Sequence, residues 1–140
     1  MHRRIIVDAN ILIRAVLGVR ARELIVRHGA DVSFFTPEVA FLDAARYLPV
    51  IAMKRGADPV PLISSLDRLR SVVEVVPDDV TGVWKSIALE RIGGRDPMDW
   101  PFVAAALALD CPIWTEDNDF FGSGVPTWTS DRVDIYLRGD

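Results

Sequence analysis

The chain is poor in the side chains that most often build cross-linked or nucleophilic sites. Its 140 residues include one cysteine, Cys111, and two histidines, His2 and His28. A single cysteine cannot form a disulfide framework or a cysteine-based zinc site within one chain, and we expect Cys111 to be a buried, inert thiol. The histidines have no serine or cysteine elbow near them, which argues against nucleophilic catalysis. No phosphate-binding P-loop or dinucleotide fingerprint is present either.

Long hydrophobic runs are also missing. The apolar stretch at the N-terminus ends at Asp8, too early for the hydrophobic region of a signal peptide. The longest later run, residues 100–109, has about half the length needed to span a membrane. We therefore expect a cytoplasmic protein without membrane contact. Because no repeat, low-complexity tract or linker divides the sequence, residues 1–140 are predicted to form a single domain.

Lysine is scarce: Lys54 and Lys85 stand against fourteen arginines. The formal net charge of −4 argues against a large, non-specific nucleic-acid surface. It leaves room for a small one, because acids clustered around a bound metal ion would have their charge offset. Arginine also binds phosphate in a bidentate manner that lysine cannot match.

The hydrophobic pattern alternates short strands with helix-length segments. Strands are expected at residues 4–7, 32–35, 72–76, 113–115 and 125–129. Helices are expected at 10–17, 20–28, 36–55, 59–69, 77–91 and 97–110, with a last helix capped by Ser130 and ending near residue 137. Thr36 is predicted to cap the long helix. This order indicates an α/β fold with a parallel sheet covered on both faces.

Four aspartates are placed where such a fold brings side chains together. Asp8 and Asp117 each follow a predicted strand, and the carboxyl ends of parallel strands form the ligand-binding edge of an open sheet. Asp43 interrupts an apolar helix, and Asp99 opens another. Carboxylates gathered in this way repel one another unless cations lie between them, and oxygen ligands suit Mg²⁺ or Mn²⁺. The pattern therefore indicates metal-assisted phosphodiester chemistry.

Each acid also has a structural interpretation. Asp8 can cap the helix that follows it. A carboxylate on an apolar helix needs a partner, and Arg46 lies three residues after Asp43. Asp96 precedes a proline and is the expected N-cap of its helix, which leaves Asp99 in the first turn, where acids are favoured. For Asp8 and Asp43 we favour metal binding over these alternatives, whereas for Asp99 only the four acids taken together favour it.

Residues 116–122 superficially resemble a calcium-binding loop. The match fails because Phe121 occupies a position that needs an oxygen ligand and Trp128 occupies that of the bidentate glutamate. A calcium sensor is therefore excluded. Asp117, at the end of a strand, is the better ligand candidate in this segment, and Asp119 is secondary.

Four segments, taken in order, resemble the motifs of PIN-domain ribonucleases. They are Val-Asp-Ala-Asn-Ile-Leu at residues 7–12, and residues 36–48, 96–106 and 113–120. The resemblance runs from residue 4 to about residue 130. It implies a three-layer α/β/α sandwich with a parallel sheet of four or five strands. It also implies an Mg²⁺- or Mn²⁺-dependent endoribonuclease, often the VapC-like toxin of a toxin–antitoxin pair.

The resemblance also implies roles for individual residues. The metal-binding and catalytic quartet would be Asp8, Asp43, Asp99 and Asp117. Supporting polar groups would be Asn10 and Thr115, and accessory acids would be Asp96 and Asp119. Arg14, Arg46 and Arg95 are expected to steady the RNA backbone. The expected partners are an RNA substrate, an antitoxin protein and a second copy of the chain.

One departure from the family pattern keeps a second hypothesis open. The family usually has glutamate where this chain has Asp43, which is one methylene shorter. A catalytically silent PIN-like module that binds RNA or a protein partner is therefore the alternative. A phosphatase of the haloacid dehalogenase type is disfavoured, because it needs a second acid where Asn10 stands.

Overall fold

The computed structural model describes residues 2–139. Its strands form one sheet in the order β3-β2-β1-β4-β5, with every neighbouring pair parallel. The strands are β1 (Arg3–Val7), β2 (Val32–Pro37), β3 (Val73–Val76), β4 (Ile113–Trp114) and β5 (Thr127–Trp128). This arrangement confirms the predicted α/β fold and its five-stranded parallel sheet.

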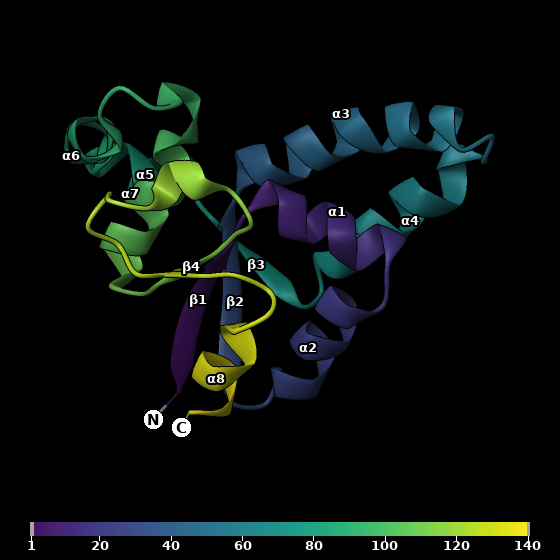
Figure 1. Ribbon diagram of the computed structural model, residues 1–140, viewed down its shortest axis with the longest axis horizontal. Helices are drawn as coiled ribbons and strands as arrows, with labels where there is room; N and C mark the ends of the chain where they lie inside the picture. Colours follow the sequence, from purple (N-terminus) through teal and green to yellow (C-terminus); the bar gives the residue numbers. More distant parts are fainter. Residues whose placement is uncertain (1, 140) are drawn as a thin grey trace.

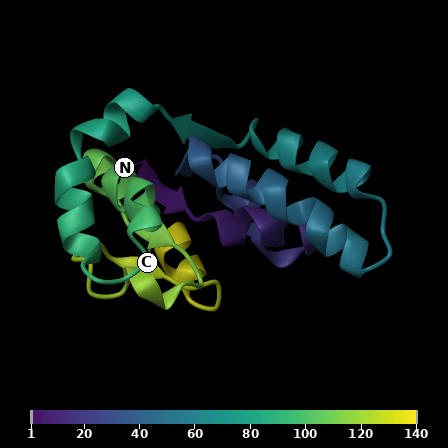
Figure 2. The ribbon, with the colours of Figure 1, turned by 90° about the horizontal axis from the view of Figure 1, so that it is seen from above.

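Helices cover both faces of the sheet, which confirms the three-layer sandwich (Figure 1). On one side lie α1 (Ala9–Leu17), α2 (Arg20–His28), α3 (Glu38–Lys54) and α4 (Pro59–Leu69). On the other lie α5 (Asp78–Val83), α6 (Lys85–Ile92) and α7 (Trp100–Leu109), and α8 (Val133–Arg138) ends the chain. Two short 3₁₀ turns are η1 (Pro97–Asp99) and η2 (Asn118–Phe120). Figure 2 shows α3 and α4 side by side, extending beyond the sheet.

The central strand is buried on both faces because helices pack on each. Ile5, Ile6 and Val7 of β1 are fully buried, and each such side chain contributes about 1.5–3 kcal/mol to folding. Helix α7 packs against β1 and β2 through small, buried side chains that allow close approach. Cys111 is buried as predicted, and burial raises the pKa of its thiol to about 12. No helix within residues 2–139 is long and apolar enough to cross a membrane.

The structure corrects three local predictions. Residues 77–91 do not form one helix: α5 ends at Val83 and α6 begins at Lys85, just after the weak helix-forming segment that contains Gly82. Thr36 does not cap α3. It lies in β2, and its hydroxyl donates a hydrogen bond to the Val7 carbonyl at 2.6 Å.

Ser130 is the third corrected residue. Helix α8 begins only at Val133, and its N-cap position is Arg132, with no side-chain hydrogen bond. The Ser130 hydroxyl instead accepts a hydrogen bond from the Trp114 indole at 3.0 Å. It therefore ties the chain after β5 to the end of β4.

Candidate metal centre

The strand order creates a switch point at one edge of the sheet. From β1 the chain proceeds to β2 and β3 on one side, and β4 and β5 lie on the other. In open parallel sheets, ligands bind in the crevice at the carboxyl ends of strands where the order reverses. Asp8 directly follows β1 there, and Thr115 directly follows β4. The sequence-predicted acids at strand ends therefore do meet at this edge.

Asp8 is held rigidly by three hydrogen bonds. Its Oδ1 accepts from the Ala9 amide at 2.7 Å, so Asp8 also caps α1. Its Oδ2 accepts hydrogen bonds from the Thr115 hydroxyl at 2.6 Å and from the side-chain amide of Asn10 at 3.0 Å. Burial raises the pKa of Asp8 to about 6; the hydrogen bonds from Thr115 and Ala9 oppose this rise, and the charges of Asp117 and Asp43 add to it. The supporting residues Asn10 and Thr115 thus contact Asp8 directly.

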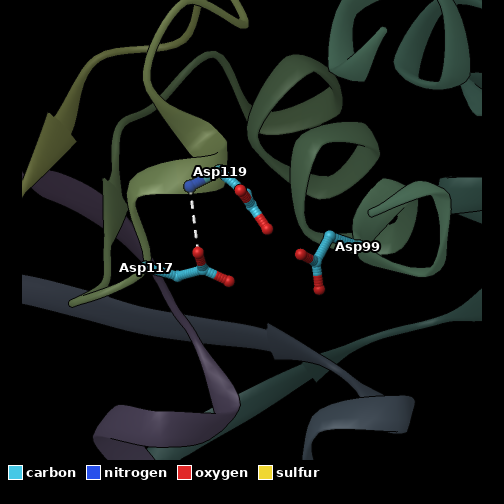
Figure 3. Close-up of side chains that lie close together, drawn as sticks. All are labelled: Asp99, Asp117 and Asp119. Atoms are coloured by element: carbon cyan, nitrogen blue, oxygen red, sulfur yellow. Dashed lines mark hydrogen bonds between the residues drawn. The ribbon is translucent and has the colours of Figure 1, made fainter. Parts of the chain in front are cut away.

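Three carboxylates meet beside Asp8. Asp99, Asp117 and Asp119 each offer one oxygen, and these oxygens lie within 4.8 Å of one another. Figure 3 shows the three side chains pointing into a common space, with Asp99 from the start of α7 and the other two from the turn after β4. We call these three residues the acidic cluster. Their oxygens are close enough for a single cation to contact all three.

The turn that carries two of these acids is fixed by its own hydrogen bonds. The Thr115 hydroxyl accepts from the Asp117 amide at 2.9 Å, and Asp117 Oδ1 accepts from the Asp119 amide at 2.9 Å. The Arg95 guanidinium donates to the Asn118 carbonyl at 2.6 Å. Asp117 and Asp119 therefore project from the same side of η2.

Asp99 has the least favourable electrostatic environment of the three acids in the cluster. Within residues 2–139, its Oδ2 is buried and has no hydrogen-bond partner. Burial raises the pKa of Asp99 to about 7, and the negative charges of Asp8, Asp96, Asp117 and Asp119 contribute to the rise. A buried carboxylate oxygen without a partner is unfavourable, and a bound cation would supply the missing partner.

Two further predicted acids, Asp96 and Asp43, also lie outside this cluster, as Asp8 does. Asp96 is exposed and caps η1, as predicted, by accepting a hydrogen bond from the Met98 amide at 3.0 Å. Asp43 lies on α3, where Arg46 Nη1 is 3.9 Å from its Oδ1. The ion pair proposed as the structural alternative is therefore present. Asp43 is still near enough for its charge to raise the pKa of Asp8.

The cluster fits a hard divalent cation. Its donors are carboxylate oxygens, which Mg²⁺ and Mn²⁺ prefer, and it contains no histidine or cysteine. The unpartnered Asp99 oxygen independently indicates a missing positive partner. Asp119, predicted only as an accessory acid, is a full member of the cluster. The signal that favours it is the Asp-Asn-Asp sequence after β4, because a short turn brings residues two apart to the same side.

Fold and site together define an α/β protein with an acidic cluster at the switch point of its parallel sheet. The family model of the PIN domain matches residues 6–138. The chain therefore belongs to the PIN-domain family, which confirms the resemblance seen in its four sequence motifs. A comparison with curated proteins finds no match.

Two solved structures share this fold. PAE2754 from Pyrobaculum aerophilum is similar with a TM-score of 0.71 and 16% sequence identity, over 99% of this chain and 91% of that chain. VapBC2 from Rickettsia felis, bound to a DNA fragment from its promoter, is similar with a TM-score of 0.67 and 12% identity, over 90% of this chain and 98% of that chain. At these identities the similarity establishes the fold alone.

Proposed function

We propose that this protein is a divalent-metal-dependent endoribonuclease that uses Mg²⁺ or Mn²⁺ to hydrolyse RNA phosphodiester bonds. The observation that carries the proposal is the acidic cluster with its unpartnered Asp99 oxygen, at the switch point of a PIN-domain sheet. Asp99, Asp117 and Asp119 would hold the cation, with Asp8 beside them. When bound, such a cation neutralises charge on the phosphate and makes water a better nucleophile.

The protein's own residues prepare this site. Thr115 and Asn10 fix the Asp8 carboxylate with two donors, so its orientation is set before substrate arrives. Thr115 also positions the backbone of Asp117. Asp96 sets the turn from which Asp99 projects. Asp43 would complete the quartet from α3 if it released Arg46.

The natural context we propose is a toxin–antitoxin pair, with this chain as the toxin. Its shared fold with the VapBC2 structure supports this, as does the apolar surface on the helical arm of α3 and α4. Leu42 and Met53 on α3 and Val60 on α4 are exposed there, with 55%, 81% and 65% of their surface accessible. Exposed apolar side chains of this kind favour contact with an antitoxin or with a second copy of the chain.

The test is cleavage of a panel of tRNAs and single-stranded RNAs in Mg²⁺, Mn²⁺ or EDTA. Wild type is compared with Asp99→Asn and with Asp79→Asn, a control that removes one exposed acid from α5. We expect metal-dependent cutting that leaves 5′-phosphate ends, is retained in Asp79→Asn and is lost in Asp99→Asn. Equal activity in both variants would contradict the proposed site.

A silent PIN-like module that binds RNA or a protein partner is the second candidate function. The observation that favours it is Asp43, which replaces the usual glutamate and lies beside Arg46 rather than in the acidic cluster. The variant Asp43→Glu separates the two candidates. Cleavage that appears only in this variant supports the silent module, whereas cleavage by wild type supports the nuclease.

A further inference from the structure

A cavity of about 670 Å³ lies at the C-terminal end of α1, whose other end is capped by Asp8. It lies where the end of α1 meets the start of α2 and the turn after β5. Its apolar lining comes from Leu17, Val19 and Ala21, and its basic lining comes from Arg14, Arg20 and Arg55. The volume is within the range of small-molecule sites, about 300–1,000 Å³. It is large enough for one nucleotide.

The arginines of this cavity, Arg14, Arg20 and Arg55, are not held in ion pairs with carboxylates within residues 2–139. The two acids that also line the cavity are engaged by neutral donors instead. Glu116 accepts a hydrogen bond from the Ser130 amide at 2.7 Å, and Asp131 accepts one from the Thr129 hydroxyl. The lining therefore carries three guanidinium groups against two carboxylates, so its balance is basic in a chain whose net charge is −4.

The cavity shares its framework with the metal centre. Arg14 follows Asp8 by six residues on α1, which corresponds to about 9 Å along a helix. Glu116 directly precedes Asp117, and its amide donates to the Asn10 side chain at 3.4 Å. None of the three acids of the cluster lines the cavity. The cavity and the cluster therefore use different side chains, and α1 and the segment of Glu116 and Asp117 connect them.

We propose that this cavity is a nucleotide subsite for single-stranded RNA. One base lies against the apolar wall formed by Leu17, Val19 and Ala21, while the adjoining phosphate is bound by Arg14 and its neighbouring arginines. Apolar wall and guanidinium groups together match a nucleotide, which presents a flat base and an anion. An acidic peptide would satisfy the arginines and leave the apolar wall unfilled. The inference rests on the proposed function for its position beside the cleaved bond.

The experiment measures binding of a fluorescein-labelled single-stranded RNA hexamer by anisotropy in EDTA, where no cleavage is expected. Arg14→Gln and Val19→Glu alter the cavity. Their matched controls are Arg22→Gln and Val26→Glu, which make the same changes on α2 outside it; Val19 and Val26 are 55% and 65% exposed, so folding tolerates both substitutions. We expect Kd to rise about tenfold in the cavity variants and less than about twofold in the controls. Arg14→Gln should also reduce the salt slope by about 0.7.

Three outcomes would overturn the inference: no binding by wild type, equal losses in cavity and control variants, or displacement of RNA by hexaglutamate with no effect of Val19→Glu. The last outcome would identify an acidic-peptide site instead. Because the assay needs no catalysis, it separates the two proposals. Cavity-dependent binding by a protein that never cuts RNA removes the nuclease and retains the subsite. RNA cleavage by wild type, with a KM that is unchanged in Arg14→Gln, would retain the nuclease and remove the subsite.

Discussion

At the scale of single residues, the unfavourable electrostatics of the candidate metal centre are concentrated in Asp99. Its pKa is raised to about 7 by burial and by four neighbouring aspartates. An acid whose pKa is higher in the folded state binds protons more tightly there than in the unfolded chain. Its contribution to stability is therefore fully present below the unfolded-state pKa of about 3.8 and is lost as pH rises through about 7.

The first prediction concerns this pH dependence. In EDTA, the melting temperature of wild type should fall between pH 5 and pH 8, and that of Asp99→Asn should fall less because the amide cannot ionise. The variant should therefore be the more stable protein at pH 8, although we expect it to be inactive. Thermal unfolding at both pH values checks this. Parallel curves for the two proteins would show that Asp99 ionises without penalty.

Thr115 gives the second prediction. Its hydroxyl donates to Asp8 and accepts from the Asp117 amide, so Thr115→Val removes one of the three donors to Asp8 and leaves the Asp117 amide without its acceptor. We expect a loss of about 1–3 kcal/mol in the free energy of unfolding and a loss of RNA cleavage. Thr115→Ser keeps the hydroxyl and should restore most of both. Urea unfolding and the cleavage assay measure the two effects; a valine variant as active as the serine variant would refute this role.

Individual residues also show which parts of the candidate site could be predicted from the sequence. The placement of Asp8 and Asp117 follows from strand ends in a parallel sheet, so both could be predicted. The prominence of Asp119 could not, because it depends on the turn geometry of η2 rather than on a strand or helix pattern. The ion pair of Asp43 was foreseeable from its spacing to Arg46, but the choice between metal ligand and ion pair depends on where α3 sits.

At the scale of elements, two short turns carry the acids of the cluster. In η1, Asp96 accepts from the amide two residues later, and in η2, Asp117 does the same. Each turn is therefore closed by an aspartate side chain, and each presents an acid to the common space. In η2 the closing residue also belongs to the cluster, whereas in η1 the closing residue, Asp96, stays outside it.

The third prediction follows from this difference. Asp96→Ala removes the cap of η1 without removing a cluster ligand, so stability should fall by about 1 kcal/mol. Mn²⁺ affinity should fall as well, because Asp99 loses its fixed position. Asp96→Asn retains a capping oxygen and should behave almost like wild type. Chemical unfolding and metal titration test both points, and equal metal affinity in the alanine and asparagine variants would argue against a positioning role.

Elements were predicted well where hydrophobic runs were long and ended at clear signals, as for α2, ended by Gly29, and α4, which begins at Pro59 with Asp58 as its cap. Elements were predicted poorly where contacts with distant parts of the chain determine the local structure. Threonine is a common N-cap residue, yet the Thr36 hydroxyl donates a hydrogen bond to the Val7 carbonyl of the neighbouring strand. That partner is 29 residues away and cannot be read from a local pattern.

At the scale of the whole molecule, the strand order makes the site. Because β4 pairs with β1, the chain after residue 114 lies next to Asp8. Helix α7 packs against β1 and β2, and this packing brings Asp99, the N-cap residue of α7, to the same edge. Four acids from distant parts of the sequence therefore lie at one edge. Their mutual repulsion destabilises the metal-free protein, which is a property of the assembled fold rather than of any one element.

The fourth prediction is that divalent metal stabilises the whole fold. At a fixed Mn²⁺ concentration, 100 times the Kd measured at pH 8, the free energy of unfolding at pH 8 should rise by about 2.7 kcal/mol. The rise should be larger at pH 8 than at pH 5, because protons compete for Asp8 and Asp99, whose pKa values are raised to about 6 and about 7. Thermal unfolding with and without Mn²⁺ measures it, and an effect independent of pH would place the metal elsewhere.

The most direct test of the metal centre is calorimetric titration of Mn²⁺ into wild type, Asp119→Asn and the control Asp79→Asn at pH 7.5. Asp119 is chosen because the sequence motif gives it only an accessory role, whereas the structure brings its carboxylate close to those of Asp99 and Asp117. We predict that Asp79→Asn binds like wild type and that Asp119→Asn binds at least about tenfold more weakly. Equal affinity in all three proteins would contradict the acidic cluster as the metal centre.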